Sequence, residues 1–358
     1  MINVTKSVLP SLEEYVEYLK GIWERGQLTN HGPLVLELEK KLREYFGVKH
    51  LFFVNNGTIA LQIAIKALQL KGEIITTPFS YVATTSTILW EGCRPVFADI
   101  EPTTLCIDPE KVEQAISKDT SAIMATHVYG NSCDVDAIAR IAAKYNVKVI
   151  YDAAHAFGVK YKDKSLLNYG DISAISFHAT KLFHTIEGGA VATNDDAVAH
   201  KISYMRNFGH NGPEDFFGVG INGKSSEFHA AMGLALLPGV AGFIERRSYT
   251  TRLYDELLAK TSVVRPKIRP GTQYNFAYYP VLFESESHLL SVRSALNNYK
   301  IFPRRYFYPA LNTLKFLPSS SMPIAENAAR RALCLPLYPD LQDADVRRIS
   351  MIIGELCS

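Results

Sequence analysis

Three short stretches of the sequence carry residue types suited to holding an anion and to chemistry on an amine. The first is Asn55–Thr58, which follows an apolar run and precedes a stretch with helical spacing. Backbone N–H groups at a helix N-terminus lack helical partners and lie at the positive end of the helix dipole. Gly57 lets an anion approach the backbone, and Thr58 adds a hydroxyl. The pattern predicts a phosphate cup, although Asn-Gly also marks ordinary turns.

The second stretch ends in a carboxylate. Asp152 closes the apolar run Lys148–Asp152, and small residues and His155 follow it. Ligands of doubly wound sheets bind beyond the carboxyl ends of the strands. A carboxylate buried there is costly unless it has a partner, and a protonated heterocyclic nitrogen would be one. The alternative is that Asp152 caps a following helix.

The third stretch, Ser176–Lys181, ends in an amine and is followed by Gly188 and Gly189. A lone lysine in a loop is usually solvated, but Lys181 lies between two apolar runs, so we expect partial burial. Burial lowers the pKa of an amine, and Schiff-base chemistry needs the unprotonated form.

Other kinds of site lack their signatures. The nearby histidines do not have the spacing of a metal motif, so no metal site is expected. The dinucleotide fingerprint and the P-loop motif are absent, and so is the G-x-S-x-G turn of serine hydrolases.

The elements that must position these residues alternate between strands and helices. Short runs rich in Ile and Val separated by helical segments favour an α/β fold with a largely parallel sheet covered on both faces. The predicted strands are Leu51–Val54, Glu73–Thr77, Pro95–Ala98, Ala122–Ala125, Lys148–Asp152, Ile172–Phe177 and Ala190–Thr193. The predicted helices among them are Thr58–Leu70, Val82–Gly92, Pro109–Ile116 and Val135–Tyr145.

Helical spacing also predicts two helices before the first strand, over Ser11–Arg25 and Leu34–Phe46, and a long polar helix over Ile244–Lys260. The pattern changes near residue 240. We therefore expect a large domain over residues 1–240, which includes the N-terminal segment, and a smaller α+β domain over 241–358.

Composition excludes several classes of protein. Hydrophobic residues make up 47% of the 358 residues, enough for a sizeable core, and the net charge of +2 gives no electrostatic case for nucleic acid or a membrane surface. The five cysteines are dispersed, which favours free thiols in a reducing compartment. The longest apolar run, Ala230–Ile244, contains Pro238 and is short for a membrane span, and no signal-peptide pattern is present. These features predict a cytoplasmic protein.

In their order along nearly the whole chain, these motifs resemble the DegT/DnrJ/EryC1/StrS sugar aminotransferases, a family of fold type I pyridoxal-phosphate enzymes. The stretches that carry the resemblance are Leu28–Pro33, Asn56–Thr58, Thr77–Thr84, Pro95–Ile100, His127–Gly130, Asp152–Ala156, Ser176–Lys181, Asn222–Glu227 and Leu335–Pro339.

The resemblance implies that the cofactor is pyridoxal 5′-phosphate and that Lys181 is the catalytic residue, which forms a Schiff base with it. Asp152 would pair with the pyridinium nitrogen and maintain the electron sink. His155 stands where many relatives have Gln, near the phenolic oxygen of the cofactor, and can still donate a hydrogen bond. Some relatives that dehydrate the sugar have His in place of Lys181, so the lysine favours amino transfer.

The resemblance also implies how the rest of the cofactor is held. The N–H groups of Gly57 and Thr58 and the hydroxyl of Ser176 would bind the phosphate. Asn222 would reach the same phosphate from a neighbouring subunit, which implies a homodimer with shared active sites. Tyr81 matches the aromatic residue that stacks on the cofactor ring.

Within the family, the stretch His178–Gly189 is most similar to enzymes that use L-glutamate to aminate C4 of a nucleotide-linked 4-keto-6-deoxy sugar for O-antigen or a related surface glycan. The expected substrate is dTDP-4-keto-6-deoxy-D-glucose. Amination at C3 of a dTDP-3-keto-6-deoxy sugar and amination of a UDP-4-keto sugar are the alternatives. Lys6, Arg206, Arg304 and Arg305 are cations available to a nucleotide diphosphate, and the sequence assigns none of them.

Two rival functions are weaker. A nicotinamide-dependent oxidoreductase would suit the alternating elements, but the glycine fingerprint is missing. A cofactor-binding regulator would need a DNA-binding module, and no separate basic module is recognisable.

Overall fold

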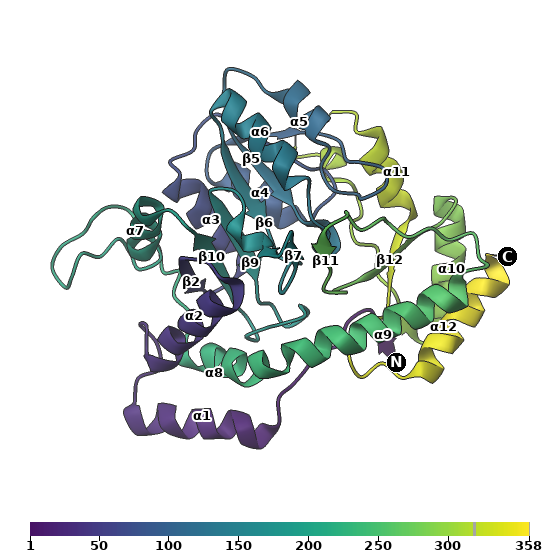
Figure 1. Ribbon diagram of the computed structural model, residues 1–358, viewed down its shortest axis with the longest axis horizontal. Coiled ribbons are helices and arrows are strands. Elements are labelled where there is room, and N and C mark those ends of the chain that lie inside the picture. Colours follow the sequence, from purple (N-terminus) through teal and green to yellow (C-terminus); the bar gives the residue numbers. More distant parts are fainter. Residues whose placement is uncertain (318–319, 358) are drawn as a thin grey trace.

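All seven predicted strands pair into one sheet in this computed structural model, which describes residues 1–317 and 320–357 (Figure 1). Six of them are parallel, and β10 runs antiparallel to both of its neighbours. The predicted α/β class with a largely parallel sheet is therefore confirmed. Across the sheet the order is β2 (His50–Val54), β10 (Gly189–Thr193), β9 (Ile172–Ser176), β6 (Lys148–Asp152), β5 (Thr120–Thr126), β3 (Glu73–Thr76) and β4 (Arg94–Phe97).

Successive side chains of a strand point to opposite faces of the sheet, and here both sets are apolar, so both faces are covered. In β5, Ala122 and Met124 belong to one buried cluster, and Ile123 and Ala125 belong to another. The first cluster packs against α3 (Gly57–Ala67), α4 (Val82–Trp90) and α7 (Asp196–Met205). The second packs against α2 (Pro33–Phe46), α5 (Pro109–Ala115), α6 (Val135–Tyr145) and α8 (Glu227–Leu236).

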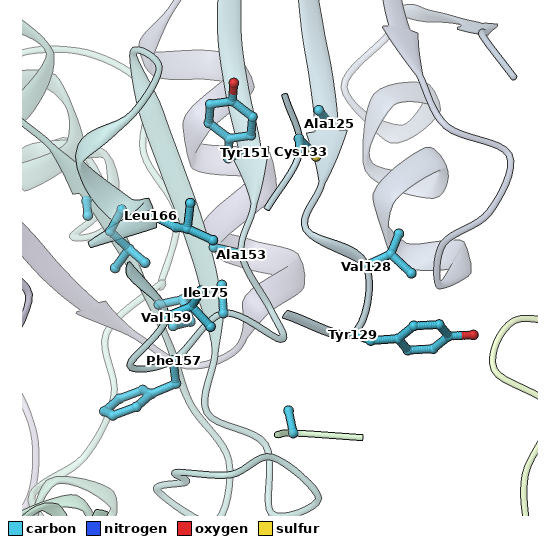
Figure 2. Packing of buried hydrophobic residues seen from close by; sticks show 14 of the residues in the cluster. Ala125, Val128, Tyr129, Cys133, Tyr151, Ala153, Phe157, Val159, Leu166 and Ile175 are labelled. Atoms are coloured by element: carbon cyan, nitrogen blue, oxygen red, sulfur yellow. The ribbon is translucent and has the colours of Figure 1, made fainter. Parts of the chain in front are cut away.

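Figure 2 shows part of the second cluster close to the carboxyl ends of the strands. Ala125, Tyr151 and Ile175 come from three strands of the sheet, and Val159 and Phe157 come from the loop after β6. This packing holds the loop after β6 against the core, and so it holds Asp152, which precedes the loop, at the end of the sheet.

Local capping explains where two helices begin. Ser11 accepts a hydrogen bond from the Glu14 N–H and caps α1 (Leu12–Arg25). Asn56 accepts one from the Ile59 N–H and caps α3. The helices α7 and α8 were not predicted, because α7 has a short apolar stripe and α8 is apolar on most sides.

The C-terminal part of the chain builds its own hydrophobic cluster. In it, β12 (Tyr279–Leu282) pairs antiparallel with β14 (Ala332–Leu335), and α9 (Val240–Leu258), α10 (Glu286–Asn298) and α12 (Asp343–Leu356) pack around the pair. The strand β1 (Ile2–Asn3) pairs with β13 (Ile301–Phe302), so the first residues lie with this part of the chain. The domain boundary at residue 240 stays a prediction, because helical structure is continuous across it.

That continuous helical stretch, Glu227–Leu258, is long and apolar enough to cross a membrane by length and composition alone. Half of its most apolar window is buried inside the protein. It lies along one side of the molecule beside α1 and α2 (Figure 1), and the helix α8 contacts both. Its apolar character is accounted for by this packing against the core, which is where an apolar helix of a globular protein is stabilised.

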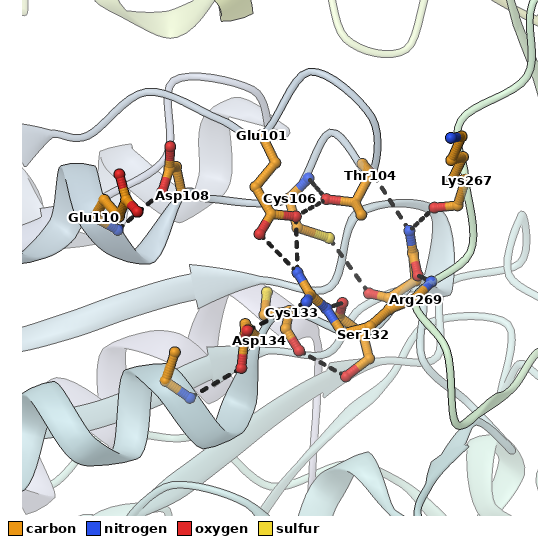
Figure 3. A network of polar contacts seen from close by, with 12 residues as sticks. Glu101, Thr104, Cys106, Asp108, Glu110, Ser132, Cys133, Asp134, Lys267 and Arg269 are labelled. Carbon is orange, nitrogen blue, oxygen red and sulfur yellow. Dashed lines mark hydrogen bonds and ion pairs between the residues drawn. The ribbon is translucent and has the colours of Figure 1, made fainter.

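A polar network ties the chain after α9 to the loops beside β4 and β5 (Figure 3). Arg269 Nη2 donates to both carboxylate oxygens of Glu101, at 2.8 and 2.7 Å, and Nη1 donates to Asp134 at 3.3 Å. Just beyond it, β11 (Thr272–Gln273) joins a small sheet with β7 (Lys160–Tyr161) and β8 (Lys164–Ser165). These contacts bring the segment from 274 to 278 against the end of the main sheet. The remaining helix, α11 (Pro323–Arg331), packs its buried alanines into the large core.

Candidate active site

A cavity of about 490 Å³ opens where β2, β5, β6 and β9 end. Seven of the eight predicted site residues line it: Gly57, Thr58, Tyr81, Asp152, His155, Ser176 and Lys181. The eighth, Asn222, is exposed and is not among the residues that line the cavity of its own chain. Its predicted role from a neighbouring subunit therefore stays a prediction.

The predicted phosphate cup is formed by the first turn of α3. The side chain of Asn56 satisfies the Ile59 N–H at 2.8 Å, and the N–H groups of Gly57 and Thr58 belong to the first turn, which has no helical acceptors. Gly57 faces Ser176 on β9 so closely that an added Cβ would lie 2.9 Å from the Ser176 Cβ. Only glycine lets the helix start and the serine hydroxyl face one ligand at this distance.

Asp152 is a buried carboxylate at the floor of the cavity. Its Oδ2 accepts from the Thr84 hydroxyl at 2.7 Å, and its Oδ1 accepts from the Ala154 N–H at 3.1 Å. Burial raises the pKa of Asp152, and these two hydrogen bonds and Lys181 oppose the rise. The alternative that Asp152 caps a helix is wrong, because Ala153–Val159 form turns.

A chain of hydroxyls extends from Asp152 and was not predicted. Thr84 Oγ1 lies 2.8 Å from Ser80 Oγ, which lies 3.1 Å from Thr126 Oγ1. A carboxylate only accepts, so Thr84 donates to Asp152 and must itself accept from Ser80. Ser80 and Thr84 fall four residues apart at the start of α4, but nothing in the sequence shows that they face a carboxylate 68 residues further on.

Lys181 lies partly buried in the cavity wall, as predicted. Burial lowers the pKa of its amine to about 8, and the negative charge of Asp152 acts in the opposite direction. A larger share of the amine is therefore unprotonated near neutral pH than for an exposed lysine. In the described part of the chain, no side chain accepts a hydrogen bond from its Nζ, which leaves the amine available to a ligand.

His155 is held in one tautomer. Its Nδ1 accepts from the Tyr129 N–H at 3.2 Å, and Tyr129 presents this N–H from a left-handed backbone conformation, with φ of 57°. Burial lowers the pKa of His155 well below its usual value, so the ring is neutral and carries its proton on Nε2. The ring stacks on Phe307, with a centroid distance of 5.7 Å. The histidine is thus a hydrogen-bond donor at Nε2.

The far wall of the cavity comes from the C-terminal part of the chain. Tyr278, Arg304, Tyr306 and Phe307 line it. Sequence reasoning missed three of them and left Arg304 unassigned, because no local motif links them to residues more than a hundred positions earlier. The Tyr129 hydroxyl donates to the Tyr306 carbonyl and joins this wall to the sheet.

This arrangement fits pyridoxal 5′-phosphate. A buried carboxylate without an ion-pair partner in the described structure suits a protonated ring nitrogen, and the helix start with Ser176 suits a phosphate. The His155 donor suits a phenolic oxygen, and the amine of Lys181 suits an aldehyde. No group of three or more His, Cys, Asp or Glu side chains is placed to hold a metal ion within residues 1–317 and 320–357.

Comparison with known proteins agrees with this geometry. The profile of the DegT/DnrJ/EryC1/StrS aminotransferase family matches residues 11–353. The chain is 45% identical to a dTDP-4-amino-4,6-dideoxy-D-glucose transaminase of Shigella dysenteriae, over 99% of both chains, and 41% identical to the transaminase of the same name from Escherichia coli, again over 99% of both. The crystal structure of DesI in the presence of its TDP-sugar product superposes with a TM-score of 0.94 at 32% identity, covering 99% of this chain and 92% of DesI.

Proposed function

This chain belongs to the DegT/DnrJ/EryC1/StrS aminotransferase family, and we propose that it moves the amino group of L-glutamate to C4 of dTDP-4-keto-6-deoxy-D-glucose. It is a transaminase that depends on pyridoxal 5′-phosphate. The observation that supports the choice of sugar and carbon is the 45% identity, over 99% of the chain, to the transaminase of Shigella dysenteriae. The products are 2-oxoglutarate and the 4-amino-4,6-dideoxy sugar.

The cofactor, when bound, supplies an aldehyde that takes up an amino group and a protonated ring that withdraws electrons from the reacting carbon. The Asp152 carboxylate would keep a proton on the ring nitrogen, because its negative charge lies in a buried place where a cation is strongly favoured. Gly57, Thr58 and Ser176 would bind the phosphate. His155 would donate from Nε2 to the phenolic oxygen, and Tyr81 would cover the ring.

Lys181 has two tasks that its lowered pKa suits. Its neutral Nζ would hold the cofactor covalently between turnovers. As a free amine beside the bound group, Lys181 would hold and move the proton of the reacting carbon. With a pKa of about 8, the same nitrogen can accept and release a proton near neutral pH.

The active enzyme is a homodimer in which Asn222 of one subunit completes the phosphate site of the other. Two observations support this proposal. Asn222 is exposed and lies outside the cavity of its own chain, and the loop before it exposes Phe216, Phe217 and Val219. An exposed group of large apolar side chains is typical of an interface.

Mixed dimers test the sharing of sites. Lys181→Ala and Asn222→Ala subunits should each be inactive or impaired as homodimers. If the sites are shared, a heterodimer of the two has one site with both changes and one native site, so mixing restores activity. If each chain completes its own site, mixing restores nothing. Light scattering gives the oligomeric state independently.

We assign the enzyme to the cytoplasm, where nucleotide sugars and glutamate are available, and to the supply of an amino sugar for O-antigen or a related surface glycan. The five buried free cysteines are compatible with a reducing compartment. Neither a nucleic acid nor a membrane is part of the proposal.

A substrate panel tests the reaction itself. The holoenzyme is incubated with L-glutamate and with dTDP- and UDP-linked 4-keto and 3-keto sugars, and NMR identifies the carbon that carries nitrogen. We expect the dTDP-linked 4-keto-6-deoxy sugar to give a C4 amine at the highest kcat/KM. Preference for a 3-keto sugar or for a UDP-linked sugar would instead establish one of the two alternatives. Lys181→Ala should abolish the bleaching of the cofactor by glutamate.

A further inference from the structure

Four cations were candidates for binding an anionic substrate, and three of them are engaged elsewhere. Lys6 pairs with Asp340, Arg206 pairs with the buried Glu39, and Arg305 Nη2 pairs with Glu286 at 2.7 Å. These interactions leave Arg304 as the remaining candidate. No ion pair joins its guanidinium to a carboxylate in the part of the chain that the structure describes, and it lines the cavity.

Arg304 is also held in place. Its backbone pairs with Cys334 of β14 through two hydrogen bonds, of 3.1 Å from its N–H and 2.8 Å to its carbonyl. Its guanidinium carbon lies 4.9 Å from the centre of the Tyr306 ring. A guanidinium over an aromatic face is attracted to it while its N–H donors stay free in the plane of the group. The side chain is therefore oriented before any ligand arrives.

The surroundings favour an oxyanion at this position. Tyr278, Tyr306 and Phe307 form an aromatic wall beside Arg304, and Arg304 is itself exposed, so its guanidinium is open to a ligand that enters the cavity. Arg304 lies over Tyr306, whose ring centre is 5.6 Å from that of Tyr278, and the Tyr278 ring centre lies 4.7 Å from that of His155. Aromatic rings thus connect Arg304 with the residues expected to face the cofactor. Among the described residues that line the cavity, the lysine and arginine side chains are those of Lys181 and Arg304, and Lys181 is assigned to the amine chemistry.

We infer that Arg304 binds an oxyanion of the substrate with its guanidinium fork, at the cavity wall that the C-terminal part of the chain forms. This inference rests on the proposed function, since both substrates of that reaction carry oxyanions. The amino donor has carboxylates, and the sugar nucleotide has a diphosphate. A guanidinium recognises either with two parallel hydrogen bonds.

Binding measurements on the holoenzyme separate the two sources. Glutarate serves as an unreactive dicarboxylate and dTDP as a nucleotide without a reacting sugar, and calorimetry gives the Kd of each. We expect Arg304→Gln to raise the Kd of one of the two probes by about 10- to 100-fold, since the free energy of hydrogen bonds to charged groups corresponds to a change of this size. The weakened probe identifies the bound group. Arg304→Lys should recover part of the loss, because it keeps the charge without the fork.

The matched control is Arg347→Gln, which removes the same charge from an exposed position on α12. It should leave both Kd values within twofold. The inference is overturned if Arg304→Gln also leaves both within twofold, or if the wild-type holoenzyme binds neither probe. Failure of the proposed function would be distinct, because the wild type would then bind a probe without aminating any sugar of the panel. An unchanged absorbance spectrum of the bound cofactor verifies that the variant is folded.

Discussion

Two adjacent buried threonines on α4 give a matched pair of substitutions that tests the role of the hydroxyl chain. The Thr84 hydroxyl donates to Asp152 at 2.7 Å, whereas the Thr85 hydroxyl is buried and has no hydrogen-bond partner in the described structure. Replacing either with valine keeps the shape of the side chain and removes one hydroxyl. The two variants therefore differ mainly in whether a carboxylate loses a donor.

The two valine substitutions should change the free energy of unfolding in different ways. A hydrogen bond to a charged group contributes about 1.5–3 kcal/mol, so Thr84→Val should lower the free energy of unfolding by roughly that amount at pH 7. Removing an unpaired buried hydroxyl relieves a desolvation cost, so Thr85→Val should be neutral or stabilising by up to about 1 kcal/mol. Thr84→Ser should recover most of the lost stability, because it restores the donor.

The loss should depend on pH. The pKa of Asp152 is already raised above its ordinary value of 3.8 by burial, and loss of the Thr84 donor raises it further. A carboxyl with a raised pKa contributes stability when it is protonated and loses that contribution as the pH rises through its folded-state pKa. The deficit of Thr84→Val should thus be largest at neutral pH and shrink as the pH falls toward 4.

Urea unfolding of the cofactor-free protein, at one fixed protein concentration, measures these differences. In the holoenzyme, Thr84→Val should lower kcat more than it changes KM for glutamate, since Thr84 acts on the cofactor only through Asp152. Equal stabilities of the two valine variants at pH 7, or a Thr84→Val deficit that does not change with pH, would refute the reasoning.

Three further substitutions test other parts of the site and the fold. Lys181→Met should stabilise the cofactor-free protein at pH 7 by about 1–3 kcal/mol, because burial lowers the pKa of the lysine from 10.5 to about 8. Between about pH 8 and pH 10.5 the unfolded wild-type chain binds more protons than the folded one, so the stability of the wild type rises with pH. Urea titrations should therefore show the difference in stability between variant and wild type closing as the pH rises. Gly57→Ala should weaken cofactor binding at least tenfold in equilibrium dialysis, because its Cβ would lie 2.9 Å from the Ser176 Cβ, whereas Gly242→Ala, with open space around the added carbon, should not. Glu227→Gln should cost about 1–3 kcal/mol in thermal or urea unfolding, because the fully buried carboxylate accepts from the Leu34 and Val35 N–H groups at 3.1 and 2.9 Å; a change as small as that of the exposed Glu245→Gln would contradict this role.

Local sequence determined the sheet strands and the first half of the site. Apolar runs and their spacing identified all seven strands, because the strands are buried on both faces and the helices between them show a regular stripe. Gly57, Asp152, Ser176 and Lys181 could be predicted to lie together because each lies at or just after the carboxyl end of a strand, and the carboxyl ends of parallel strands share one edge. The position of each residue relative to a predicted strand was sufficient to place it at this edge of the sheet.

Only the tertiary structure decided the rest. Thr84 faces Asp152 because α4 follows a strand two places away in the sheet, an order that periodicity does not contain. Arg304 became distinguishable from Lys6, Arg206 and Arg305 when the other three were seen to be paired. A single sequence shows which side chains carry charge and where strands end, but the availability of a charge to a ligand depends on which distant groups already neutralise it. Whether a charge is already neutralised is decided by the packing between elements, and a local sequence pattern does not predict it.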